Sequence, residues 1–352
     1  MYFFIFNEPK LIENLSVNSL SDFISLLDNE GKLYSRFLEK FSKKDEEVET
    51  GDEEKGYQKY IAYAEANKKR EYAAYLSSHN SKQQGDSKHI VFYRGISDSS
   101  YVPVPSVYRN NTIKYEDKYI NDIRVSNPGF VQGRDYIDEL SALQHYWCPT
   151  RLLDLTINPL VALYFACEDL QTDNSSKEGC IEFYLAKSDE ILHSNSDKVL
   201  ILTALSHLPE NDKKAILEIC VDEIESKGVN KAILNGTLAS RVSVKKLYRE
   251  ILRTTNFDRS IMCIDLLQSF YVQPALNNSR IRAQSGLFLI NGLCQNEREC
   301  SLRNNNKMFA RIIVPSSAKK NILRELDRVG INRKTMFPEI EDTVKYLKTK
   351  YK

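Results

Sequence analysis

The residue types best suited to chemistry are concentrated in one stretch, residues 142–166, which reads ALQHYWCPTRLLDLTINPLVALYFA. Its polar part carries His145, Tyr146, Arg151 and Asp154. Histidine titrates near neutral pH, so His145 is suited to acid–base catalysis, unless it only bonds a backbone carbonyl and holds the loop. Tyr146 and Trp147 could stack on a nucleobase or on nicotinamide, or form a wall of the core. Arg151 and Asp154 could bind a ligand or pair with each other.

The polar stretch leads directly into an apolar helix, which we expect over residues 160–166. Asn158 is placed to cap this helix, and Pro159 occupies its first position, where a missing N–H is tolerated. A helix N-terminus exposes unpaired N–H groups and a partial positive charge, so it suits an anion such as phosphate. Thr156 and Asn158 therefore lie in a loop where such an anion could bind.

Upstream, Arg94 and Gly95 follow the apolar run at residues 90–92. Arg94 could hold a phosphate bidentately, or it could pair with a buried carboxylate such as Asp154. Gly95 would allow the backbone to turn or a ligand to approach.

Downstream, Arg280, Arg282 and Gln284 alternate before the apolar run at residues 286–290. Alternation predicts that the three side chains share one face at the start of a strand. The charges and hydrogen-bond donors on that face would be satisfied by an anionic ligand or by exposure to solvent.

Together these segments resemble the FRG domain family, named for its (Phe/Tyr)-Arg-Gly motif. The resemblance covers roughly residues 88–290 and extends to a tail motif. The matching positions, in chain order, are Tyr93-Arg94-Gly95, Gln144-His145-Tyr146, Pro149-Thr150-Arg151-Leu152-Leu153-Asp154, Asn158-Pro159 with Ala162 and Phe165-Ala166, Arg280-Ile281 with Gln284, Gly286-Leu287-Phe288, and Phe337-Pro338-Glu339-Ile340-Glu341.

The order of the motifs is also similar to that of ADP-ribosyltransferases. This resemblance implies that Arg94, Thr156 and Gln284 form a NAD-type cleft, in the roles of the first-strand Arg, the Ser/Thr before the helix and the final Glu or Gln. The usual catalytic residue of that superfamily is Glu, whereas Gln284 can bond a ribose hydroxyl but supplies no negative charge. Another carboxylate would have to supply it, Asp154 and Glu139 being nearby in sequence, or the reaction is a different one.

Composition excludes several classes of protein. The 352 residues carry a net charge of +1, which gives no general electrostatic footprint for nucleic acid. No run of 18 apolar residues exists and the N-terminus lacks a signal core, so we expect a cytoplasmic protein without a membrane span. The seven cysteines form no C-x-x-C pair, which indicates free thiols rather than zinc. Cys148 has a second interpretation, because a nearby His and Arg could lower its pKa and make it a nucleophile.

Periodicity predicts an α+β fold, in which a mixed or largely antiparallel sheet carries the three motifs and helices flank it. We expect a helical N-terminal segment over residues 1–85, an FRG-like domain over 86–315 with a helical insertion at about 187–258, and a helical tail over 316–352. The expected strands are 90–93, 180–185, 286–291 and 309–314, and the expected helices include 57–76, 113–126, 136–146, 316–329 and 343–351.

Two hypotheses for function follow. The first is an enzyme-like cleft for a nucleotide or NAD, as in an ADP-ribosyltransferase-like effector of bacterial defence or stress that acts on a protein target. The alternative is a non-catalytic nucleotide-sensing or protein-interaction module. Gln284 favours the module, and the cluster around His145 favours the enzyme. Under the first hypothesis the catalytic residues are His145, Gln284 and Asp154, and the ligand-binding residues are Arg94, Gly95, Tyr146, Arg151, Thr156, Asn158 and Arg280.

Overall fold

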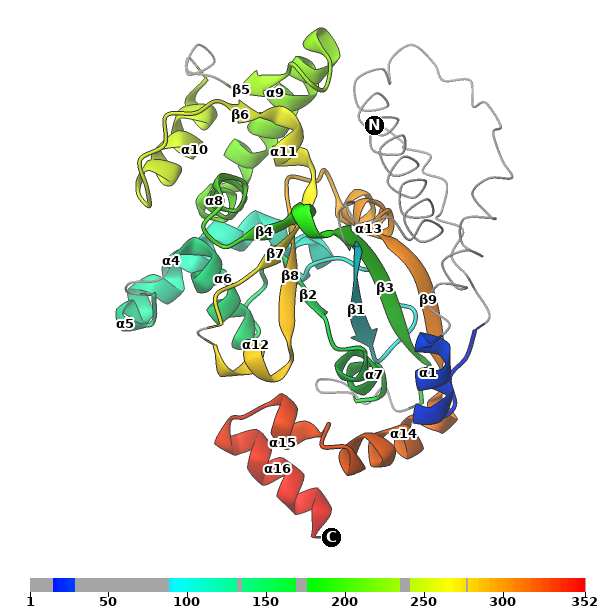
Figure 1. Ribbon diagram of the computed structural model, residues 1–352. Helices are drawn as coiled ribbons and strands as arrows, with labels where there is room; N and C mark the ends of the chain where they lie inside the picture. The colour runs from blue at the N-terminus through cyan, green and yellow to red at the C-terminus, as the bar shows by residue number, and fades with distance from the viewer. Residues whose placement is uncertain are drawn as a thin grey trace, which may run out of the picture.

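The computed structural model describes residues 15–28, 89–131, 135–168, 176–234, 241–276 and 278–351. Within them, seven strands form the main sheet in the order β4-β7-β8-β2-β1-β3-β9 (Figure 1). All neighbours are antiparallel except β4 and β7. The predicted α+β fold with a largely antiparallel sheet is therefore confirmed. The strands are β1 (His89–Ile96), β2 (Leu152–Thr156), β3 (Gly179–Lys187), β4 (Ile191–His193), β7 (Ser269–Gln273), β8 (Gly286–Asn291) and β9 (Met308–Val314), and a separate pair is β5 (Ile233–Leu234) and β6 (Ile261–Met262).

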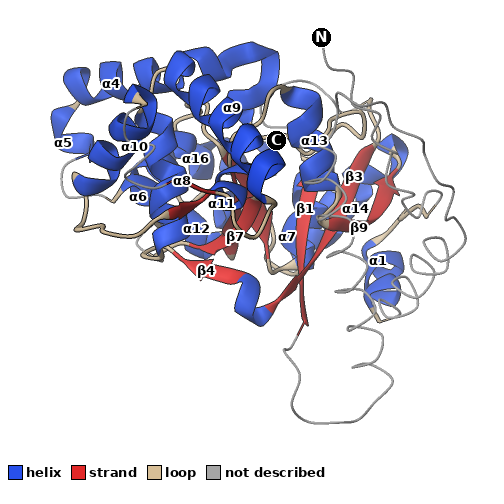
Figure 2. Ribbon diagram, turned by 90° about the horizontal axis from the view of Figure 1, so that it is seen from above, coloured by secondary structure: helices blue, strands red, loops and turns tan. Residues whose placement is uncertain are grey.

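Helices cover both ends of the sheet. Those of the predicted insertion gather beside β4 and β7, and α1 and α14 lie beside β9, as two views at right angles show (Figures 1 and 2). The helices are α1 (Leu20–Leu27), η1 (Ser106–Tyr115), α4 (Glu116–Ser126), α5 (Pro128–Val131), α6 (Tyr136–His145), α7 (Pro159–Cys167), η2 (Ser188–Glu190), α8 (Asp197–Ala204), η3 (Leu205–His207), α9 (Glu210–Lys227), α10 (Val242–Leu252), α11 (Cys263–Leu267), α12 (Ser279–Ala283), α13 (Glu297–Asn305), α14 (Ser316–Arg328), α15 (Arg333–Met336) and α16 (Ile340–Lys350).

The sheet is buried on both faces, which explains why β1 reads as a continuous apolar run. Successive side chains of a strand point to opposite faces. Tyr93 accordingly packs in one apolar cluster with α7 and α14, whereas Phe92 packs in another with Leu155 and Tyr184. The helices of the insertion enclose a third cluster, to which β8 contributes Phe288.

Helix α7 begins as the sequence predicts. The Asn158 side chain accepts a hydrogen bond from the backbone N–H of Leu160 at 3.0 Å, and Pro159 follows in the first turn. Six of the nine residues of α7 are buried, because the helix packs on β1 and is covered by α14. The core of the domain thus holds the helix start in a fixed place at the end of β2.

Gly95 owes its place to this packing. A Cβ atom at Gly95 would lie 1.8 Å from the backbone oxygen of Ala162 in α7. Only a residue without a side chain allows helix and strand to approach so closely. The sequence prediction placed Gly95 beside a ligand, and the structure shows that α7 already occupies the space next to its Cα.

We expect Gly95→Ala to lower the free energy of unfolding by about 3 kcal/mol or more, because relief of the clash requires α7 to move away from the sheet. The midpoint of urea unfolding, followed by circular dichroism, measures the effect. Gly129→Ala is the matched control, since a Cβ there would meet no atom within 4 Å. Equal midpoints for the two variants would contradict the packing role of Gly95.

The predicted helices 113–126, 136–146, 316–329 and 343–351 correspond to α4, α6, α14 and α16, and the insertion contains α8, α9 and α10. Strands β4, β5, β6 and β7 and helix α13 were not predicted from the sequence. Of the predicted N-terminal helical segment, α1 is described, whereas the expected helix over 57–76 lies outside the described residues. The proposed domain boundaries stay a prediction. Among the described helices, none combines the length and the apolar character that crossing a membrane requires.

Candidate ligand-binding cavity

The main sheet is split between β1 and β2. These strands share the single register pair Tyr93↔Thr156, whereas β1 and β3 are paired from His89 to Ile96. A cavity of about 460 Å³ lies beside this split. Arg94 and Gly95 of β1 line it, as does Asp154 of β2.

Seven of the ten predicted site residues line this cavity, although they come from β1, α6, β2, α12 and the turns beside them. The seven are Arg94, Gly95, His145, Asp154, Thr156, Arg280 and Gln284. Tyr146, Arg151 and Asn158 do not line it. Arg151 and Asn158 are held by contacts within the protein, and Tyr146 lies outside the cavity, as described below.

Arg94 is held by a carboxylate that the sequence did not indicate. Its Nη1 atom donates a hydrogen bond to Oε2 of Glu182 at 2.9 Å, across a register pair of β1 and β3. Glu182 is fully buried, and it also accepts a hydrogen bond from the Tyr184 hydroxyl at 2.8 Å. Burial lowers the pKa of Arg94, but the attraction of Glu182 outweighs it and raises that pKa above its usual value. Asp154, the partner considered from the sequence, does not pair with Arg94.

Arg109 is a cavity residue that the sequence analysis missed. Its Nε and Nη2 atoms donate to the backbone oxygen of Val104 at 2.9 and 2.7 Å, which holds the guanidinium at the cavity wall. Burial and then the like charge of Arg94 lower the pKa of Arg109. It belongs to no motif, and only its place in η1, which follows the first strand, could have indicated it.

Asp154 is the exposed residue of the otherwise buried β2, because its carboxylate faces the cavity. Gln144 donates to its Oδ2 atom at 2.7 Å, and the Thr150 hydroxyl donates to the Gln144 side-chain oxygen at 2.6 Å. This chain of hydrogen bonds orients the carboxylate. Solvent reaches Asp154 through the cavity, but the surrounding protein still disfavours its ionised form and raises its pKa. A carboxyl group with a raised pKa is suited to acid–base chemistry.

The structure contradicts the prediction that Arg151 binds a ligand or pairs with Asp154. Arg151 immediately precedes β2, and its side chain is 0% exposed and does not line the cavity that Asp154 faces. Its Nε donates to Glu116 at 2.9 Å, and the Lys213 ammonium donates to the same carboxylate at 2.7 Å. Burial alone would raise the pKa of Glu116, but these two cations lower it to about 2.

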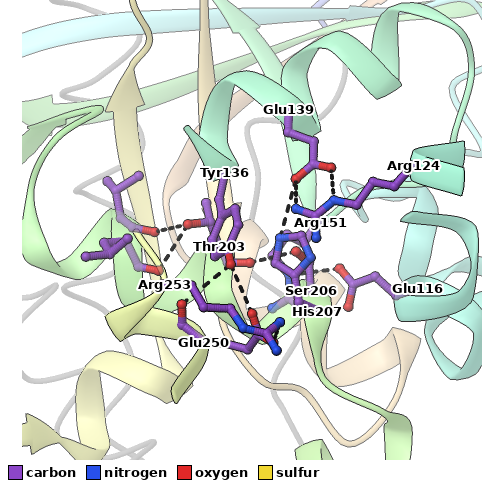
Figure 3. Close-up of polar contacts among 12 residues, drawn as sticks. Glu116, Arg124, Tyr136, Glu139, Arg151, Thr203, Ser206, His207, Glu250 and Arg253 are labelled. Carbon is purple, nitrogen blue, oxygen red and sulfur yellow. Dashed lines mark hydrogen bonds and ion pairs between the residues drawn. The ribbon is translucent and has the colours of Figure 1, made fainter. Parts of the chain in front are cut away.

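Glu139 belongs to the same buried region and not to the cavity. Both of its oxygens accept hydrogen bonds from Arg124, at 2.7 and 2.6 Å. Figure 3 shows this pair beside Arg151 and Glu116. Of the two carboxylates considered from the sequence, Asp154 is therefore the one that a ligand in the cavity could reach.

Thr156 and Asn158 use their side chains to build the loop. The Thr156 hydroxyl donates to the backbone oxygen of Gln284 at 2.7 Å and accepts from the backbone N–H of Asn158 at 3.0 Å. The side-chain oxygen of Asn158 is the cap of α7. These contacts join the helix start to α12, so neither group is positioned to be a phosphate ligand.

Arg280, Arg282 and Gln284 do not alternate along a strand, which corrects the sequence prediction. Asn278 caps α12 by accepting a hydrogen bond from the Arg280 N–H at 2.8 Å, so the chain turns into a short helix. Residues four apart share a helix face, which brings Arg280 and Gln284 to the cavity and leaves Arg282 exposed. The Gln284 amide then donates to the backbone oxygen of Met336 at 3.1 Å.

His145 contacts a carboxylate of the C-terminal segment rather than a backbone carbonyl. Its Nε2 atom lies 3.0 Å from Oε1 of Glu339. Burial and then the positive charge of Arg280 lower the pKa of His145, and the attraction of Glu339 offsets them only in part. His145 is therefore neutral near pH 7, in a form that can accept a proton.

The motif-bearing elements have a counterpart among known families. Residues 89–175 match the model of the FRG domain. The chain contains an FRG domain. No curated protein and no solved structure matches the chain.

The FRG domain supplies most of the cavity but does not complete it. The matched residues include Arg94, Arg109, His145 and Asp154, with the strands and helices that hold them. Arg280 belongs to α12, more than 100 positions beyond the end of the match. The remaining wall of the cavity is therefore formed by residues outside the matched FRG domain.

The cavity is electropositive. Three guanidinium groups line it, those of Arg94, Arg109 and Arg280, whereas Asp154 is the single acidic side chain among its lining residues. Arg280 donates to the backbone oxygen of His145 at 3.3 Å and lies over the Phe337 ring, 4.4 Å from its centroid. Because no ion pair is formed between Arg280 and a described carboxylate, its charge remains available to an anion.

Cys148 is not a nucleophile at neutral pH. Burial raises the pKa of the Cys148 thiol to about 11, so the prediction of a lowered pKa is wrong and the thiol is protonated at neutral pH. All seven cysteines of the chain are free. Among the described residues, no group of His, Cys, Asp and Glu side chains is arranged to hold a metal ion.

Proposed function

We propose that the cavity binds a nucleotide, with its phosphate groups among Arg94, Arg109 and Arg280. The observation that carries this proposal is the arrangement of three guanidinium groups around a cavity of about 460 Å³ that contains one carboxylate. Guanidinium groups match the geometry of phosphate oxygens, and ligand cavities of folded proteins have volumes of this order. In the absence of turnover, such a site makes the protein a nucleotide-sensing module.

Cleavage of the glycosidic bond of NAD is a second candidate, which Asp154 favours. Its carboxyl group faces the cavity, and in its ionised form it could supply the negative charge that Gln284 cannot. Against turnover, the Thr156 hydroxyl and the Gln284 amide are engaged in contacts within the protein. An ADP-ribosyltransferase-like effector in bacterial defence or stress would require this turnover, so binding is our first proposal.

Calorimetric titration with pyrophosphate, ADP and NAD tests the binding site. We expect saturable binding by the wild type and a loss of about ten- to a hundredfold in Arg109→Gln, which is the effect of removing one charge-assisted hydrogen bond. Arg282→Gln removes the same charge from the exposed face of α12 and should bind like the wild type. Circular dichroism verifies that both variants are folded. Absence of binding by the wild type, or equal losses in the two variants, would contradict the proposal.

A further inference from the structure

A second pocket of about 630 Å³ adjoins the cavity on its outer side. His145, Trp147 and Arg280 line both spaces. The opposite wall of this outer pocket is the C-terminal segment, which includes Phe337 and Glu339. In Figure 1, α15 and α16 lie below α12, at the end of the sheet where β2 leads into α7. A ligand that fills the cavity can therefore extend past Arg280 into the outer pocket.

The turn after α6 exposes two large aromatic side chains to this pocket. Tyr146 is 68% exposed and Trp147 is 58% exposed. Trp147 has a φ of +65°, a left-handed conformation that a bulky residue rarely adopts, and its N–H donates to the Gln144 carbonyl at 3.0 Å. Strained backbone of this kind persists where the surrounding structure enforces it, often at ligand sites. The Arg280 guanidinium lies 5.6 Å from the centre of the indole ring.

The facing wall carries hydrogen-bond acceptors that the described residues do not satisfy. Both side-chain oxygens of Glu339 are buried and accept no aligned hydrogen bond from a described residue, although Oε1 lies 3.0 Å from His145. On the near wall, the Nδ1 atom of His145 is also buried and has no hydrogen-bond partner among the described residues. Buried polar atoms of this kind require a partner, and for a carboxylate that partner is an N–H or O–H donor.

We infer that the outer pocket holds the nucleoside end of a ribonucleotide, with the base stacked on Trp147 and the ribose hydroxyl groups donating to Glu339. An aromatic ring, a carboxylate and an adjoining cluster of guanidinium groups match the three parts of such a ligand in their order, base, ribose and phosphate. The inference rests on the proposed function, since the phosphates occupy the cavity. It adds that the ligand is recognised at two sites, one on each side of Arg280.

Trp147 is the single tryptophan of the chain, so intrinsic fluorescence reports directly on the outer pocket. The protein is titrated with pyrophosphate and, separately, with ADP, GDP, CDP and UDP. We expect at least one nucleoside diphosphate to change the emission of Trp147 and to bind at least fivefold more tightly than pyrophosphate, about the lower limit of a base-stacking contribution. Pyrophosphate is expected to bind without a stacking signal.

Two variants separate the base from the ribose. In calorimetry, Trp147→Ala should bind the preferred diphosphate only as tightly as pyrophosphate, with pyrophosphate affinity unchanged. Glu339→Gln should lose the preference for that diphosphate over its 2′,3′-dideoxy form, which a purely structural role of Glu339 would not affect. Tyr115→Ala is the control, because Tyr115 is also exposed but lines neither space.

The outcomes distinguish the inference from the proposed function. If neither pyrophosphate nor any diphosphate binds, the proposed function is wrong and the inference falls with it. If pyrophosphate binds but no diphosphate binds more tightly or changes the emission, only the inference is wrong. Equal losses of pyrophosphate and diphosphate affinity in Trp147→Ala would also overturn it, because the effect would then be structural.

Discussion

Arg151→Met is expected to lower the free energy of unfolding by about 3–5 kcal/mol, the effect of removing one partner from a buried ion pair. Arg151 and Glu116 are both buried, and after the change the carboxylate keeps only Lys213 as a cationic partner. Methionine replaces the aliphatic part of the side chain, so the effect comes mainly from the lost charge and hydrogen bonds. Urea unfolding at pH 7 measures the difference.

The buried charges of Arg151, Glu116 and Lys213 also predict that the stability of the fold depends on pH. The pKa of Glu116 is about 2 in the folded protein and near 4.5 in an unfolded chain. The stability that this lowered pKa provides is complete above pH 4.5, and it is lost as the pH falls toward 2. Its size is about 3 kcal/mol. Burial lowers the pKa of His207 to about 3, which also weakens the fold below pH 6.5, so the wild type and the variant are compared at each pH.

In Arg151→Met the pKa of Glu116 rises, and we expect a shallower loss of stability between pH 4.5 and 2. Arg259→Met is the control, because it removes an exposed partner of Asp197 and should change the free energy of unfolding by less than about 1 kcal/mol. Similar unfolding midpoints for Arg151→Met and Arg259→Met would show that the buried pair does not stabilise the fold.

Unlike Arg151→Met, Asp154→Asn is expected to leave the fold stable and to increase the affinity for the ligand. The pKa of Asp154 is raised, so its stabilising contribution exists below the unfolded pKa and is lost as the pH rises through the folded value. Because the fold disfavours the ionised form of Asp154, Asn, which cannot ionise, should give an equal or higher unfolding midpoint at pH 7. Removal of the negative charge from among three guanidinium groups should raise phosphate-ligand affinity on the order of tenfold.

This variant also separates an enzyme from a sensing module. With NAD as substrate and nicotinamide release as the measurement, an enzyme would lose turnover by about 100-fold or more in Asp154→Asn while it still binds NAD. Tighter binding with no turnover by the wild type would mark a sensing module. Asp122→Asn, on an exposed position of α4, should match the wild type in both assays. A lower unfolding midpoint for Asp154→Asn would instead reveal a structural role for this carboxylate.

Local features of the fold could be predicted because their causes lie within a few residues. Asn158 and Pro159 start α7 through one side-chain hydrogen bond and one missing N–H, both of which are visible in the sequence. The apolar runs around Phe92 and Leu289 predicted buried strands for the same reason. Where two local signals competed, as at α12, the Asn278 cap determined the conformation and the alternation of Arg280, Arg282 and Gln284 proved misleading.

The partners of the charged residues were decided by the tertiary structure. Arg94 meets Glu182 because β1 and β3 pair in one register, and the buried side chain of Arg151 meets Glu116 rather than the cavity that Asp154 faces. Coulombic attraction does not depend on separation in the sequence, so residue types alone left these partners open. The sequence by itself determined which polar residues lie next to a strand or at the start of a helix. The sheet register and the packing of the C-terminal segment decided which of them face the cavity, because only they set the distances between charges.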